Sequence, residues 1–157
     1  MKAASIHEIK QELQTLPESR LLELCLRLAK YKKENKELLD YLLFEAHDND
    51  AYIAGVKKMM DEDFNELPKS TLFHTKKSLR KTLRNTAKYI KYTGSRQVEA
   101  ELLIYLCQSL KSSGIGVHRH KALEIIYQAQ IKKINAAIGS MHEDLQYDYK
   151  RQLEKLT

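Results

Sequence analysis

Apolar residues recur at every third or fourth position along most of this chain, the spacing that places them on one side of an α-helix. A clear series is Leu123, Tyr127, Ile134 and Ile138. Five glycines, two prolines and few β-branched runs disfavour a fold rich in sheet. The sequence therefore predicts an all-α protein, built as a bundle or a superhelical stack of seven to eight helices.

Capping residues and helix breakers divide this pattern into segments. Three Ser/Thr-x-x-Glu boxes begin at Ser5, Thr15 and Ser140, and such boxes satisfy the first free amides of a helix. The polar segment 32–36 has neither glycine nor proline, so it either turns the chain or lets one long helix pass through; we favour a turn. The expected helices lie near residues 5–14, 15–32, 38–46, 51–64, 70–93, 95–111, 117–138 and 140–156.

Two of the expected segments are apolar on too many sides for a surface helix. They surround Leu42 and Leu103, and we expect both to lie at the centre of the fold, packed on at least two sides. The predicted core consists of apolar residues that share helix faces: Leu24, Leu28, Leu39, Leu42, Leu43, Ile53, Leu79, Leu83, Ile90, Leu103, Leu106, Ile126, Ile134 and Leu153.

A chain of 157 residues is long enough to bury a core without disulfides or metal, so residues 1–157 are predicted to form a single domain. Cys25 and Cys107 both lie in apolar helical patterns, which indicates reduced core residues and a cytoplasmic protein. The N-terminus lacks the apolar core of a signal peptide. The longest unbroken apolar run, residues 102–107, is far too short to span a membrane.

Positive charge is concentrated in one part of the chain. Residues 67–98 carry nine lysines and arginines and no acidic residue, although the whole chain has a net charge of only +6. On a helix, the basic side chains from 76 to 91 fall within an arc of roughly 140°. A separate seam of Leu72, Leu79, Leu83 and Ile90 is expected to dock on the core, and a sector of threonines lies beyond this seam. The candidate binding residues are those of the arc: Lys76, Lys77, Arg80, Lys81, Arg84, Lys88 and Lys91.

This basic arc has two interpretations. It is either a solvated helix face, partly neutralised by the preceding acidic segment 61–66, or a binding surface for a polyanion. As a binding surface it fits a non-catalytic protein-interaction module that takes an acidic protein partner or a second copy of itself. The alternative is a nucleic-acid-binding protein of low specificity, with Tyr89 and Tyr92 placed to stack on unpaired bases.

Residues that could carry catalysis or bind metal are sparse. Residues His118, Arg119 and His120 follow a loop with two glycines at the start of an expected helix. An anion-binding site at the first amides of this helix is one interpretation, but a loop with helix-capping polar residues explains the segment better. His47 and His142 have acidic neighbours, but no histidine lies in the Glu-x-x-His spacing of di-metal bundles, so solvated helix ends explain both clusters better. The sequence predicts no enzyme, no metal site and no cofactor.

Three segments carry a family resemblance: residues 26–39 (LRLAKYKKENKELL), 88–95 (KYIKYTGS) and 142–149 (HEDLQYDY). Together they resemble a family of small all-helical bacterial proteins of unknown function. The resemblance spans most of the chain. It implies no activity, ligand or catalytic residue.

Overall fold

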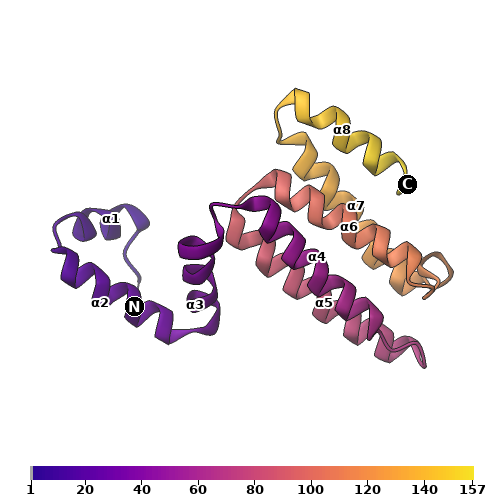
Figure 1. Cartoon of the computed structure of the whole chain (residues 1–157), viewed down its shortest axis with the longest axis horizontal. Coiled ribbons are helices and arrows are strands. Elements are labelled where there is room, and N and C mark those ends of the chain that lie inside the picture. The colour runs from indigo at the N-terminus through magenta and orange to yellow at the C-terminus, as the bar shows by residue number, and fades with distance from the viewer. Residues whose placement is uncertain (1) are drawn as a thin grey trace. The chain divides into compact units, whose positions relative to one another are not determined.

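The computed structural model describes residues 2–157 and builds them almost entirely from helices (Figure 1). Within these residues there are eight α-helices and no β-strand, which confirms the all-α prediction of seven to eight helices. The elements are α1 (Ile6–Gln14), α2 (Glu18–Tyr31), α3 (Lys33–Asp40), the π-helical turn η1 (Tyr41–Glu45), α4 (Asn49–Asn65), α5 (Leu72–Thr93), α6 (Arg96–Ser112), the 3-10 turn η2 (Val117–Arg119), α7 (Lys121–Gly139) and α8 (Glu143–Glu154).

The chain divides into two compact units, Met1–Phe44 and Glu45–Thr157. Among the described residues, all of the buried apolar ones except Tyr41 belong to the second unit. The prediction that residues 1–157 form a single domain stays a prediction.

The second unit is a helical bundle with α6 at its centre. This helix packs against α4, α5, α7 and α8 (Figure 1). Leu102, Leu106 and Cys107 are fully buried along it, and Leu103 is only 4% exposed. A helix with neighbours on several sides buries apolar residues around most of its circumference. The prediction of a central helix around Leu103 is therefore confirmed.

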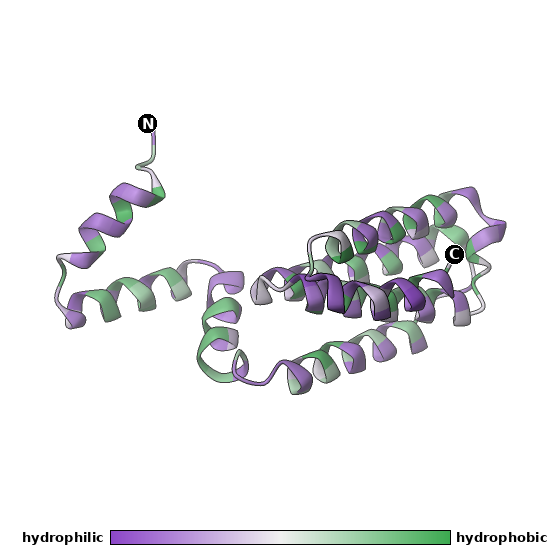
Figure 2. Ribbon diagram, turned by 90° about the horizontal axis from the view of Figure 1, so that it is seen from above, coloured by the Kyte–Doolittle hydropathy of each residue, from purple (hydrophilic) through white to green (hydrophobic). Residues whose placement is uncertain are grey.

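The prediction of a second central helix around Leu42 is wrong. Residues 41–45 form the π-helical turn η1, where Leu42 is 56% exposed and Leu43 is 62% exposed. In the first unit α2 packs against α3, and α1, α2 and α3 bury no residue. An apolar surface that extends around a helix needs neighbours on several sides to be covered. Figure 2 shows the apolar positions of α2 and α3 in green.

The predicted core separates into three groups. Ile53, Leu79, Leu103, Leu106, Ile134 and Leu153 are buried, as expected. Leu24, Leu39, Leu83, Ile90 and Ile126 are half-buried. Leu28, Leu42 and Leu43 are exposed, so their prediction is wrong. The exposed ones all lie in the first unit, where α1, α2 and α3 bury no residue.

The predicted turn near residue 32 is confirmed. Lys32 has extended backbone angles, φ −139° and ψ 144°, and it ends α2 where α3 begins. The capping box of α1 is also confirmed: the Ser5 amide donates to Glu8 Oε2 at 2.7 Å, and the Glu8 amide donates to Ser5 Oγ at 3.3 Å.

The other two predicted capping boxes are wrong. The Thr15 hydroxyl donates to the carbonyl of Glu12 at 2.7 Å, and the Ser140 hydroxyl donates to the carbonyl of Ala137 at 2.9 Å. Both hydroxyls therefore satisfy the free carbonyls at the end of the preceding helix. The N-caps of α2 and α8 are Pro17 and His142 instead.

Candidate functional site

Helix α5 carries the basic arc, and its two ends are well defined. Thr71 is the N-cap, and its hydroxyl accepts a hydrogen bond from the His74 amide at 3.3 Å. Gly94 ends the helix in the left-handed conformation at φ +61°, which glycine adopts without a steric penalty. The 22-residue helix between them fixes the spacing of the basic side chains.

The buried face of α5 differs from the expected one. Thr75, Leu79, Thr82 and Thr86 are buried on it. We expected the seam of Leu72, Leu79, Leu83 and Ile90 to dock on the core, but Leu72 is 40% exposed, and Leu83 and Ile90 are half-buried. The helix is thus rotated about its axis so that its threonine sector faces the core, and this orientation leaves Leu83 and Ile90 partly exposed.

Hydrogen bonds allow the threonines to be buried. Thr75 Oγ1 donates to the carbonyl of Pro68 at 2.5 Å, and Thr82 Oγ1 donates to Asp63 Oδ2 on α4 at 2.8 Å. A satisfied hydroxyl leaves the threonine with an apolar methyl group to pack against the neighbouring helices. Thr86 Oγ1 is the exception, because it is buried without a hydrogen-bond partner in the part of the chain that the structure describes.

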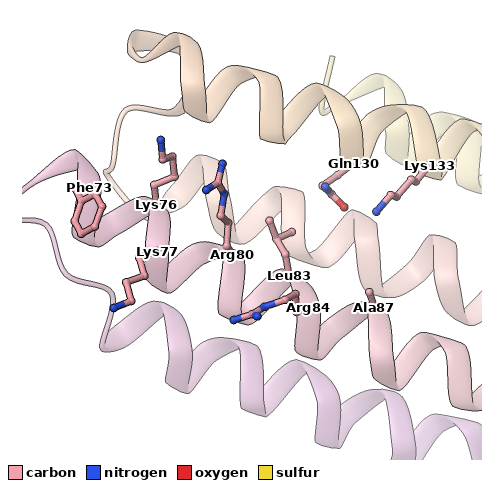
Figure 3. A pocket seen from close by; sticks show the side chains of 9 residues that line it. All are labelled: Phe73, Lys76, Lys77, Arg80, Leu83, Arg84, Ala87, Gln130 and Lys133. Carbon is pink, nitrogen blue, oxygen red and sulfur yellow. The ribbon is translucent and has the colours of Figure 1, made fainter.

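A groove of about 590 Å³ lies between α5 and α7. Lys76, Arg80 and Leu83 project from α5 toward α7, and Lys133 points back from α7 (Figure 3). The aliphatic part of the lining is Leu83 and Ala87. The complete lining is Phe73, Lys76, Lys77, Arg80, Leu83, Arg84, Ala87, Gln130 and Lys133.

The groove continues toward the C-terminal end of α5. A second hollow of about 440 Å³ shares Leu83, Ala87, Gln130 and Lys133 with the first. It adds Ile90 and Lys91 from α5 and the buried Leu103 from α6. We call both hollows together the basic groove: α5 and α7 form its walls, and aliphatic side chains form its floor.

The first hollow is strongly electropositive. Its lining has five cationic side chains and no acidic one. Within the described residues, none of these five cations forms an ion pair. The second hollow contains Glu99, but the Arg96 guanidinium holds its carboxylate at 2.7 Å. The positive charge of the basic groove is therefore available to a bound anion.

The acidic segment that precedes α5 does not neutralise this charge by ion pairs. Asp61 Oδ1 accepts a hydrogen bond from the Tyr105 hydroxyl at 2.6 Å, which raises the pKa of that hydroxyl. Asp63 accepts from Thr82, as described above. In residues 2–157, no ion pair joins the acids of segment 61–66 to α5.

Five of the seven predicted binding residues line the basic groove: Lys76, Lys77, Arg80, Arg84 and Lys91. Lys81 does not line it. Lys88 does not either, and its ammonium group lies over the ring of Tyr89 at 4.8 Å from the centroid.

Sequence reasoning did not place several lining residues at the binding surface, among them Phe73, Gln130 and Lys133. Phe73 lies on the same side of the helix as Arg80 and Arg84, so helical spacing alone was enough to place it with the basic arc. Gln130 and Lys133 belong to α7. Nothing in the sequence indicates that this helix borders α5.

The predicted base-stacking tyrosines contact each other. The rings of Tyr89 and Tyr92 pack edge to face with centroids 6.1 Å apart. Neither ring lines the basic groove. The Tyr52 hydroxyl donates to the carbonyl of Tyr89 at 3.0 Å and connects this stretch of α5 to α4.

The candidate metal and anion residues take other roles. Asp48 Oδ1 accepts from the Ala51 amide at 3.0 Å and caps α4. His118 Nδ1 lies 2.5 Å from a carboxylate oxygen of Glu124. Hydrogen bonds from Gln128 and His118 lower the pKa of Glu124. Among residues 2–157, no group of three or more His, Cys, Asp or Glu side chains is arranged to hold a metal ion.

Comparisons with protein-family models, with curated proteins and with solved structures find no match to this chain. None of the helices described here is both long enough and apolar enough to cross a membrane.

Proposed function

We propose that this protein is a non-catalytic interaction module whose basic groove binds an acidic segment of a partner protein. One observation carries the proposal: an aliphatic floor lies between cationic walls that no ion pair within the described residues neutralises. Carboxylates of the partner segment would pair with the cations of the walls, and its apolar side chains would pack on the aliphatic floor. The lining of the first hollow has no carboxylate, imidazole, hydroxyl or thiol for catalysis. In the second hollow the Ser95 hydroxyl caps α6 and the Glu99 carboxylate is paired with Arg96.

Salt dependence separates this proposal from the nucleic-acid alternative. A nucleic acid would contact the cationic walls through phosphates, so its affinity would fall steeply with salt. Its bases would find mostly aliphatic groups, since Phe73 is the single aromatic residue of the first hollow. A protein segment would retain part of its affinity at high salt, because burial of apolar surface does not depend on screened charges.

A cytoplasmic location is a further part of the proposal. Both cysteines are free. Cys107 is buried as expected, whereas Cys25 is exposed, so its prediction as a core residue is wrong. Free thiols are typical of proteins in a reducing compartment.

The test compares two labelled probes of equal charge by fluorescence anisotropy. One is a peptide of glutamates and leucines in equal number, and the other is oligo-dT. We expect both to bind in about 50 mM salt, and only the peptide to retain measurable binding near 200 mM. Arg80→Glu with Arg84→Glu should abolish binding of the peptide, because the two reversals place negative charge in the middle of the groove.

The matched control is Lys81→Glu with Lys132→Glu, which changes the net charge by the same amount at exposed positions outside the groove. We expect this control to bind the peptide nearly as well as the parent does. Equal loss of binding in both double variants would show that only the overall charge matters. A parent protein that binds the oligonucleotide but not the peptide would overturn the proposal in favour of nucleic acid.

A further inference from the structure

We infer that the partner segment binds the basic groove as an amphipathic acidic α-helix that lies along α5 and packs on both α5 and α7. This inference rests on the proposed function. It adds the conformation of the partner and the pattern of its side chains.

The shape of the groove supports a helical occupant. Both α5 and α7 pack on α6, and the groove lies between them with Leu103 of α6 in its floor. A helix laid in a notch between two helices completes the packing around a third, as in four-helix bundles. The lining residues of α5 extend from Phe73 to Lys91, a length of roughly 27 Å at 1.5 Å per residue. A groove of this length fits a segment better than it fits a small anion.

The spacing of the floor residues supports the same conformation. Leu83, Ala87 and Ile90 follow one another at intervals of four and three residues, so they form a continuous aliphatic ridge along α5. A partner helix with apolar residues at the same spacing packs its ridge beside this one. An extended strand would turn every second side chain away from the floor, and it would find no sheet edge to pair with in the described residues.

The distribution of charge supports an acidic polar face on that helix. Lys76 and Arg80 project from α5 toward α7, and Lys133 points from α7 toward α5 (Figure 3). Cations thus border the aliphatic floor on both sides. An amphipathic helix seated on the floor would place glutamates or aspartates beside the row of cations on α5 and beside Lys133 on α7. Such complementarity favours this partner over a neutral helix.

The test uses the full chain and two synthetic peptides of about 18 residues, long enough to span the groove as a helix. Both contain the same glutamates, leucines and alanines. In the patterned peptide the leucines recur at three-and-four spacing, and in the scrambled peptide they do not. We expect the patterned peptide to bind about tenfold tighter, because only a helical stripe buries several leucines at once. The circular dichroism of the mixture at 222 nm should exceed the sum of the separate spectra.

A pair of variants tests the floor without changing charge. Ala87→Gln places a larger polar side chain on the floor, whereas Ala54→Gln makes the same change at an exposed position of α4. We expect the first variant to remove the preference for the patterned peptide while both peptides still bind weakly through charge. The second variant should behave like the parent.

Each other outcome has a definite meaning. If neither peptide binds, the proposed function fails together with this inference. If both peptides bind equally tightly, or no helix forms on binding, the proposed function stands and the helical occupant is wrong. If the free protein elutes as a dimer that Arg80→Glu with Arg84→Glu dissociates, the occupant is a second copy of this chain, and the inference of a separate partner is overturned.

Discussion

At the scale of single residues, three threonines lie on the buried face of α5. Thr75 and Thr82 find acceptors at Pro68 and Asp63, so the cost of removing their hydroxyls from water is offset. Thr86 Oγ1 is buried with no partner among the described residues. The two kinds of threonine therefore contribute differently to stability, although they share one helix face.

The first prediction compares two valine substitutions that keep the shape of threonine. Thr82→Val should lower the free energy of unfolding by about 1 kcal/mol, because Asp63 loses its hydrogen-bond donor. Thr86→Val should leave the protein equally stable or stabilise it by about 1 kcal/mol, since it removes an unpaired buried hydroxyl. Urea unfolding of the two variants measures both values. A large destabilisation by Thr86→Val would show that its hydroxyl has a partner, such as a bound water molecule.

At the scale of secondary-structure elements, two segments with similar apolar composition have different surroundings. Helix α6 has neighbours on several sides, and Leu103 on it is 4% exposed. The turn η1 leaves Leu42 56% exposed. The hydrophobic effect acts only on surface that is removed from water, so the two leucines should contribute very unequally to stability.

The second prediction tests this difference with the same substitution at both sites. Leu103→Ala should destabilise the protein by about 2–5 kcal/mol, because it leaves a cavity in the core. Leu42→Ala should change stability by less than about 1 kcal/mol, as is usual for exposed positions. Thermal or urea unfolding measures both. Equal, large destabilisation by the two substitutions would mean that Leu42 is covered in solution.

At the scale of the whole molecule, the buried core belongs to one of the two units. Within residues 2–157, every buried apolar residue except Tyr41 lies in Glu45–Thr157. The first unit includes α1, a nine-residue helix with no buried residue. Isolated helices of this length are marginal in water, so α1 depends on its capping box and on any neighbour it meets.

The third prediction follows from this unequal distribution. A fragment of residues 45–157 should fold alone and unfold in one cooperative transition, with a melting temperature within about 5 °C of the full chain. A peptide of residues 1–44 should show little helix by circular dichroism. A fragment 45–157 that fails to unfold cooperatively would instead support the prediction of a single domain over residues 1–157.

Much of the candidate site could be read from the sequence because helical spacing is a local property. The 3.6-residue period placed Lys76, Arg80 and Arg84 on one side of a helix, and Gly94 marked where that helix ends. The capping box at Ser5 and the turn near Lys32 were also predictable from adjacent residues, although the same box pattern at Thr15 and Ser140 did not form a cap. These features need no knowledge of distant parts of the chain.

Tertiary structure decided which helices become neighbours and how each is rotated about its axis. Helical spacing cannot show that Lys133 of α7 faces the basic side of α5, because their separation in sequence carries no information about contact. It also cannot show that Thr82 donates its buried hydroxyl to Asp63 of α4, or that Leu83 lines the groove. The sequence by itself determined the helices and the local concentration of charge. Packing determined the groove, because a groove exists only between elements that long-range burial of apolar surface brings together.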